Sequence, residues 1–147
     1  MNSLIVDERL HATEVLALIN AQFVDGDADT RAYEYGMVPG DKNHPDQALR
    51  VAAQPDRYAV VALSQRYVEV VNLGGGQDVL GWRINVVAVG RTPNEAHWVN
   101  VRIDRALRRV RARIGDRTTT QIRFENGSAP MPDDGYYSAS SSWTYAH

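Results

Sequence analysis

The stretch GWRINVVAVGRTPNEAHWVNVRIDRAL (residues 81–107) changes from a two-residue apolar repeat to a helical one within a few positions. Leu80, just before the stretch, and Trp82, Ile84, Val86 and Ala88 alternate with other residues. Such alternation predicts a strand with one packed face. The helical repeat that follows predicts a strand that turns directly into an amphipathic helix.

The expected helix has a clear start. Thr92 is placed to cap it, Pro93 suits the first helical position, and Glu95 completes a capping box by reaching back to the backbone N–H of Thr92. Its apolar stripe consists of Val99, Ile103, Ala106, Leu107, Val110 and Ile114. A helix of about 20 residues, roughly 30 Å long, is therefore expected to lie across a sheet.

Residues 1–66 predict a helix and two strands. Apolar residues recur at helical spacing over residues 9–22, and TRAYEYGMVP (residues 30–39) places Tyr33, Tyr35 and Met37 on one face of a strand. Residues 40–56 are too long for a simple hairpin, and Pro45 favours the start of a short inserted helix. RYAVVALSQ (residues 57–65) is an apolar run typical of a strand covered on both faces.

The remaining segments predict three further features. The glycines at positions 74–76 indicate a hairpin tip between two antiparallel strands, and TTTQIRFENG (residues 118–127) alternates as a half-buried strand. SAPMPDDG (residues 128–135) is expected to form a turn. YYSASSSWTYA (residues 136–146) then puts Tyr137, Ala139, Trp143 and Tyr145 on one face of a closing strand.

The order helix, strand, strand, strand, helix, strand, strand predicts an α+β fold. We expect a mainly antiparallel sheet of about five strands packed by two principal helices. Residues 1–147 are interpreted as a single domain, with a possible inserted short helix or loop at 40–56.

Composition favours an ordinary globular chain without a membrane segment. The hydrophobic fraction is 44% and the net charge is −2. No apolar run reaches the roughly 18 residues that span a bilayer, and MNSLIVDERL lacks the order of a signal peptide. The chain has no cysteine, so disulfides, thiolate nucleophiles and cysteine-based metal sites are excluded.

No motif of the sequence predicts catalysis or a bound cofactor. DGDAD (residues 25–29) resembles a calcium loop, but Thr30 and Gly36 occupy the positions that need a glycine and an acid. The four histidines lie in separate elements and are interpreted as surface residues: His11, His44, His97 and His147. We therefore expect a protein that is not an enzyme, with no catalytic residue, no cofactor and no metal.

Charge is unevenly distributed along the chain. Residues 102–117 hold seven arginines and two aspartates, whereas residues 1–46 hold nine acidic and three basic residues. At 100° per residue, one stripe of the expected helix carries Arg102, Arg105, Arg109 and Arg113. Asp104 is placed to pair with Arg108, but no acid of the helix lies on the stripe itself.

Three interpretations of this arginine stripe remain open: a solvated face, a nucleic-acid site or a site for an acidic protein surface. Nucleic-acid binding calls for overall basicity or interleaved aromatics, and the isoelectric point is near 6.1. An acidic protein surface is the better target. Asp25, Asp27 and Asp29 of an identical neighbour supply one, and such a head-to-tail contact closes into a ring when the rotation permits.

Several segments together resemble the tail terminator proteins of long-tailed, siphovirus-type phages that infect actinobacteria. They are YEYG (33–36), RYAVVAL (57–63), the strand-into-helix unit of residues 81–107, and PMPDDGYYSASSSWTYA (130–146). The resemblance covers nearly the whole chain, and the strand-into-helix unit is its most specific part. Segment 40–56 departs from the shorter, proline-rich connection of that group.

The resemblance implies a homo-hexameric ring in the virion neck, assembled in the host cytoplasm. Such a ring caps the tail tube protein, stops tube polymerisation and joins the head-completion or stopper protein. Genomic DNA passes through the lumen without sequence-specific binding, and no membrane is involved. The alternatives are another neck component, either a head–tail adaptor or a stopper, and a small nucleic-acid-binding module.

Overall fold

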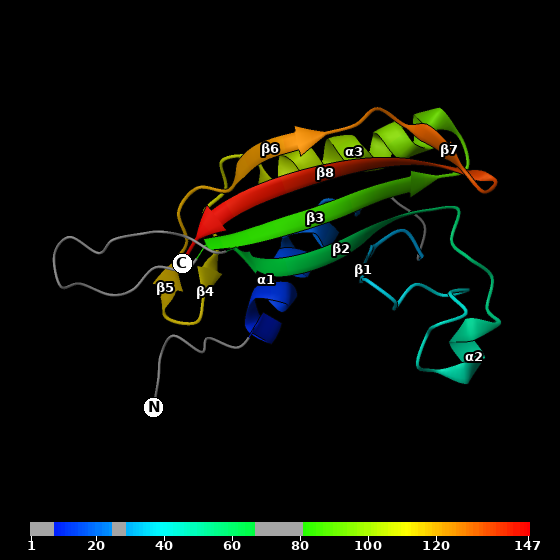
Figure 1. The fold of residues 1–147 in the computed structure, drawn as a ribbon, viewed down its shortest axis with the longest axis horizontal. Coiled ribbons are helices and arrows are strands. Elements are labelled where there is room, and N and C mark those ends of the chain that lie inside the picture. Colours follow the sequence, from blue (N-terminus) through cyan, green and yellow to red (C-terminus); the bar gives the residue numbers. More distant parts are fainter. Residues whose placement is uncertain (1–7, 25–28, 67–80) are drawn as a thin grey trace, which may run out of the picture.

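The computed structural model describes residues 8–24, 29–66 and 81–147, and it has the expected α+β fold (Figure 1). Its helices are α1 (Glu8–Asn20), α2 (Gln47–Arg50) and α3 (Pro93–Leu107). Its strands are β1 (Ala32–Glu34), β2 (Arg57–Arg66), β3 (Gly81–Gly90), β4 (Arg113–Ile114), β5 (Arg117–Thr118), β6 (Arg123–Gly127), β7 (Met131–Asp133) and β8 (Tyr136–Ala146).

The main sheet has six strands and is antiparallel at every pairing except one. Its order is β1-β2-β3-β8-β6, and β7 also pairs with β8. The short β1 runs parallel to β2. The expected antiparallel pairing of β2 with β3 is confirmed over the full length of both strands, while residues 74–76 lie outside the described part.

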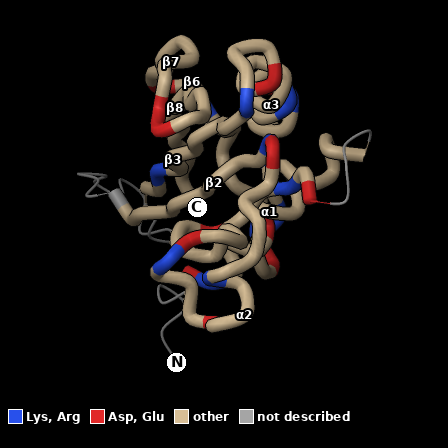
Figure 2. Tube along the Cα trace, turned by 90° about the vertical axis from the view of Figure 1, so that its right-hand side faces the viewer, with Lys and Arg blue, Asp and Glu red and all other residues tan. Residues whose placement is uncertain are grey.

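Helices α1 and α3 pack on the same face of this sheet, as the edge-on view shows (Figure 2). The alternating residues of β3 and β8 face these helices, with Ile84 opposite Trp143 and Trp82 opposite Tyr145. The predicted packed faces are therefore confirmed over residues 82–88 and 139–145, while Tyr137 is half-buried and Leu80 lies outside the described residues. Ser141 shares this face, and its hydroxyl accepts a hydrogen bond from Trp143 Nε1 at 2.9 Å.

Close contact of α3 with the sheet depends on Gly90, the last residue of β3. A Cβ atom at this position would lie 2.4 Å from the backbone nitrogen of Ala96 in the first turn of α3. Only glycine permits this approach, and it lets the strand turn into the helix within two residues.

The expected capping of α3 is mostly confirmed. The Thr92 hydroxyl accepts a hydrogen bond from the Glu95 backbone N–H at 3.2 Å, and Pro93 occupies the first turn. The Glu95 carboxylate reaches back to the N–H of Arg91, at 3.3 Å, rather than to that of Thr92. The predicted donor to the Glu95 carboxylate, the Thr92 N–H, is therefore wrong by one residue.

The expected length of α3 is wrong, because the helix ends at Leu107 after 15 residues. Arg109 has a φ of 61°, which takes the chain out of the helix. Beyond it the backbone pairs with residues 117–122, for example from Arg109 N–H to the Ile122 carbonyl at 2.9 Å. Ala112 and Ile114 are buried while Arg111 and Arg113 are exposed, which is the two-residue period of an extended chain.

Segment 40–56 contains the short helix that was expected, but that helix packs nothing into the core. Asp46 caps α2, so the helix begins after Pro45, and none of its residues is buried. Of the residues that continue the segment, Val51 is 85% exposed. Val38, just before the segment, packs on the far face of the sheet with Tyr58, Val89 and Tyr136, so only this end of β2 is covered on both faces.

Three other expectations need correction. The strand expected in residues 30–39 ends at Glu34, and Tyr35 is 81% exposed because the chain turns away at Gly36, whose φ is 83°. In the segment around β6, Ile122 is fully buried as expected, but Phe124 is 43% exposed. The expected turn at residues 128–135 contains β7, and the turn into β8 is made by two residues with positive φ, Asp134 and Gly135.

Candidate interaction surface

The four arginines predicted to form one helical stripe are not on one helix. Arg102 and Arg105 lie on α3, Arg109 follows the end of the helix, and Arg113 is in β4. The predicted line depended on a helix continuing to position 114, so it is wrong as a geometric feature. A different grouping of arginines replaces it.

Arg102 is taken up by packing. Its guanidinium lies 4.0 Å from the centre of the Trp98 ring, and the guanidinium of Arg57 lies at the same distance from that ring. Trp98 also stacks on Phe23, with ring centres 6.0 Å apart, which connects the segment after α1 to α3. With two guanidinium groups and Phe23 packed around it, Trp98 does not offer the open ring face that stacks on a nucleic-acid base.

An exposed arginine surface forms where α3 ends and the chain becomes extended. We define it by Arg105, Arg109, Arg111 and Arg113, all of which are exposed. Within residues 8–24, 29–66 and 81–147, none of the four forms an ion pair. Arg111 was missed because it does not share a helical face with the others, although the alternation with Ala112 and Ile114 could have revealed it.

Arg108 lies beside this surface and has a different role. The expected pair with Asp104 is confirmed, at 2.6 Å between Arg108 Nη2 and Asp104 Oδ1. This hydrogen bond raises the pKa of Arg108 above its ordinary value. The guanidinium also lies 5.1 Å from the ring centre of Phe124 and 5.5 Å from that of Trp143, so it packs on these two side chains on the helix-covered face of the sheet.

The acidic residues expected to meet the arginines are only partly visible. Asp25 and Asp27 lie outside the described residues. Asp29 is exposed, and its carbonyl accepts a hydrogen bond from the Tyr33 hydroxyl at 3.0 Å. The structure thus leaves the predicted pairing of these aspartates with a neighbour's arginines as a prediction.

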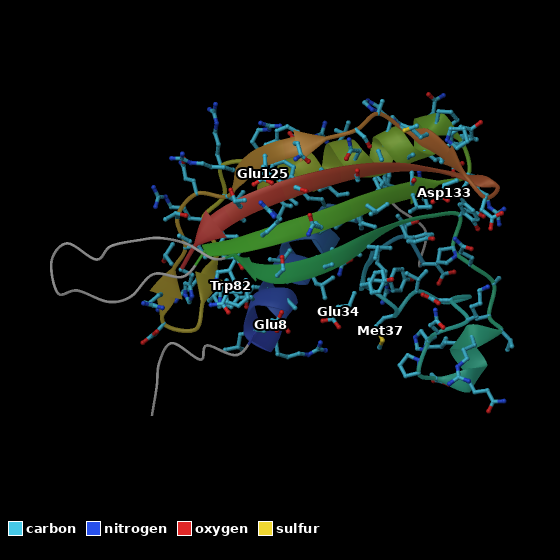
Figure 3. All side chains as sticks on the ribbon, in the orientation of Figure 1. Glu8, Glu34, Met37, Trp82, Glu125 and Asp133 are labelled. Carbon is cyan, nitrogen blue, oxygen red and sulfur yellow. The ribbon has the colours of Figure 1, made fainter. Side chains whose placement is uncertain are left out.

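A second acidic region lines a groove between α1 and β2, which we call the α1–β2 groove. Its volume is about 400 Å³, and its apolar wall includes Ala12, Leu16 and Leu63. Glu8 and Glu34 lie at its rim, on α1 and β1 (Figure 3). Arg9 pairs with Glu34 at 2.6 Å, so the rim holds two carboxylates and one guanidinium.

Three of the four histidines are buried, contrary to the expectation that they are surface residues. His11 is 0% exposed, His44 3% and His147 7%. The His11 ring stacks on Trp82 at 3.9 Å, and its Nδ1 is hydrogen-bonded to the Tyr145 hydroxyl at 2.6 Å. Sequence spacing could not predict this contact, because the three residues come from α1, β3 and β8, which are far apart in the sequence.

Burial shifts the titration of two side chains of this cluster, His11 and Tyr145. Burial lowers the pKa of His11 from 6.5 to about 4, with smaller contributions from His147 and Arg117. Burial also raises the pKa of Tyr145. Both side chains are therefore neutral at pH 7, and none of the residues that line the α1–β2 groove belongs to the cluster.

The described residues contain no cluster of three or more histidine, aspartate or glutamate side chains placed to hold a metal ion. Among the described helices, none has the length and apolar character needed to cross a membrane.

No protein-family model and no curated protein matches this chain. One solved chain, which carries no descriptive name, has a similar fold with a TM-score of 0.61. The alignment covers 95% of this chain and 94% of that chain, at 9% sequence identity. At this identity the likeness shows the fold alone, over essentially the full length of both chains.

Proposed function

We propose that this chain is a non-catalytic structural subunit of a phage virion, of the kind that the resemblance to tail terminators implies. In this proposal it forms a homo-hexameric ring in the virion neck, caps the tail tube protein and stops tube polymerisation. The ring joins the tail to a head-completion or stopper protein, and genomic DNA passes through its lumen without sequence-specific contacts.

The observation that carries the proposal is the arginine surface. Four exposed guanidinium groups without a carboxylate partner in the described residues attract a surface of opposite charge. The face of Trp98 is taken up by two guanidinium groups, so this ring offers no platform for a base, and the isoelectric point near 6.1 also favours an acidic protein over a nucleic acid as partner. A neighbouring subunit or the last ring of the tail tube is the partner that fits.

The test is the length of tails made with and without this gene in its phage of origin, measured by electron microscopy. Overlong, headless tails in its absence are expected if the ring terminates the tube. Tails of normal length would reject termination and leave the other neck roles, an adaptor or a stopper, which the identity of the bound protein would separate.

The double variant Arg105→Glu, Arg109→Glu tests the arginine surface itself. Reversing both charges is expected to abolish capping, so that complementation restores few or no normal virions, while the purified monomer stays folded. The matched control is Lys42→Glu, an exposed charge reversal on the segment before α2. A normal virion yield from the double variant would overturn the assigned role of this surface.

A further inference from the structure

The main sheet has two open edges in the described part of the chain. On one side, β1 pairs with residues 59–61 of β2, and the last bond of this side joins the Tyr35 N–H to the Val61 carbonyl at 3.0 Å. Residues 62–66 of β2 continue beyond that bond. On the other side, β6 ends the strand order, with β8 as its one neighbour there. Open edges carry unpaired backbone groups that accept a further strand.

The direction of the strands suits these two edges to each other. β2 is antiparallel to β3, β3 to β8, and β8 to β6. It follows that β6 runs opposite to β2. If a second copy continued the sheet in the same orientation, its β6 would meet β2 of the first copy as an antiparallel pair.

The side chains at the two edges also match. Phe124 on β6 is paired with Trp143 and lies edge-on to it at 5.2 Å, so it is on the helix-covered side of the sheet. It is still 43% exposed at the sheet edge. The α1–β2 groove lies on the same side of the opposite edge, with Leu63 in its wall. Continuing the sheet would bring the Phe124 ring to this groove.

The charges around the two edges are complementary. Arg109 donates its N–H to the Ile122 carbonyl, directly before β6, and Arg105 is exposed one turn earlier on α3. Glu8 and Glu34 lie at the rim of the groove (Figure 3). Arg9 already pairs with Glu34 at this rim, so the charge left there for the arginines of the next copy is that of Glu8.

We propose that the outer edge of β6 in one copy pairs antiparallel with residues 62–66 of β2 in the next copy, with Phe124 entering the α1–β2 groove. The contact is heterologous, so its repetition closes a ring or extends a filament. It rests on the proposed function in assuming that the chain assembles with itself, and it replaces the aspartates at positions 25–29 with Glu8 as the neighbour's acidic group.

The proposed contact predicts which residues of β2 lie opposite those of β6, because paired residues point to the same face of the sheet. Leu63 faces the helices, so Phe124 lies opposite an odd-numbered residue of β2, and Arg123 lies opposite an even-numbered one such as Ser64. Within one chain, Arg123 and Ser64 are on opposite edges of the sheet. Three strand spacings separate them, which is a distance of about 14 Å. A short cross-link between them must join two copies.

The experiment uses the full chain, which has no cysteine of its own. The double variant Arg123→Cys, Ser64→Cys is treated with a short bifunctional thiol reagent over a range of protein concentrations. We expect a ladder of covalent oligomers. The matched control, Arg123→Cys with Ser140→Cys, keeps both thiols exposed on the same sheet face but moves one to the central strand β8, and it should give no ladder.

A second variant keeps the test independent of thiol chemistry. Phe124→Ala removes the ring and is expected to weaken self-association about tenfold or more, because a buried aromatic at an interface is typically a hot spot. Near-ultraviolet circular dichroism checks that the monomer stays folded. A double-cysteine variant without a ladder at any concentration would overturn the proposed contact.

The outcome is separable from that of the tail-length experiment. A ladder together with tails of normal length would establish the edge contact and reject tail termination. Overlong tails in the absence of the gene, without a ladder in the double-cysteine variant, would support termination and show that the ring uses another surface.

Discussion

At the scale of single residues, His11 couples the stability of the fold to pH. It is fully buried against Trp82 and Tyr145, and its pKa in the folded state is about 4 against an ordinary value of 6.5. Below pH 6.5 the unfolded chain therefore takes up a proton that the folded chain does not. The contribution of the neutral ring to the free energy of unfolding is therefore fully present above pH 6.5. It falls by up to about 3 kcal/mol as the pH is lowered towards 4.

Replacing the imidazole tests this coupling. His11→Phe keeps a ring on Trp82 but cannot titrate, and Tyr145→Phe in the same chain removes the hydroxyl that would lose its partner. We expect the double variant to lose less stability than the wild type between pH 7 and pH 5, measured by urea unfolding. Equal losses in the two proteins would show that His11 does not titrate as described, and Tyr145→Phe alone is the control.

At the scale of elements, the end of α3 is held by tertiary contacts against its local preference. Arg109 has a φ of 61°, which costs a residue with a Cβ atom roughly 1–2 kcal/mol. Glycine does not pay this cost, although it adds entropy to the unfolded chain. The two effects partly cancel. We therefore expect the free energy of unfolding of Arg109→Gly to lie between that of the wild type and about 1 kcal/mol above it.

The same substitution removes a member of the arginine surface, so it separates folding from assembly. Arg109→Ala is the matched variant, because it removes the guanidinium without relieving the backbone. We expect the glycine variant to be more stable than the alanine variant in thermal unfolding, and both to assemble less well. A glycine variant that unfolds more easily than the alanine variant would contradict the assigned backbone conformation.

These contacts also explain what the sequence could and could not predict. The start of α3 follows from Thr92, Pro93 and Glu95, which act within one turn, and it was predicted correctly. Its end was not, because Val110 and Ile114 continue a helical stripe and also fit an extended chain. The pairing of residues 109–114 with residues 117–122 decides between the two, and it is not visible in a local pattern.

The candidate site divides in the same way. Arg105, Arg109 and Arg113 were predicted to share one helical stripe; they do not, but all three are exposed near the end of α3. Arg102 instead packs on Trp98, and Arg111 joins the exposed arginines through the strand period. The α1–β2 groove could not be predicted at all. It exists because β1 ends at Glu34 and leaves the second half of β2 without that neighbour.

At the scale of the whole molecule, salt separates the forces that would join two copies. Raising the salt from about 0.1 M to about 1 M shortens the Debye length from about 10 Å to about 3 Å. The attraction between the arginine surface and Glu8 at the groove rim is exposed, and it is therefore screened. The backbone pairing of β6 with β2 and the burial of Phe124 do not depend on salt in this way.

Self-association is consequently expected to weaken with salt without disappearing, as measured by sedimentation equilibrium. In the Arg105→Glu, Arg109→Glu variant, the self-association that remains should no longer weaken as salt is raised, because the charges that salt screens are no longer complementary. A nucleic-acid-binding module would behave differently: DNA would bind at low salt, and its affinity would fall steeply with salt. Binding of DNA at low salt, together with self-association that is the same in both proteins at every salt concentration, would contradict the acidic protein partner and assign the arginines to phosphate.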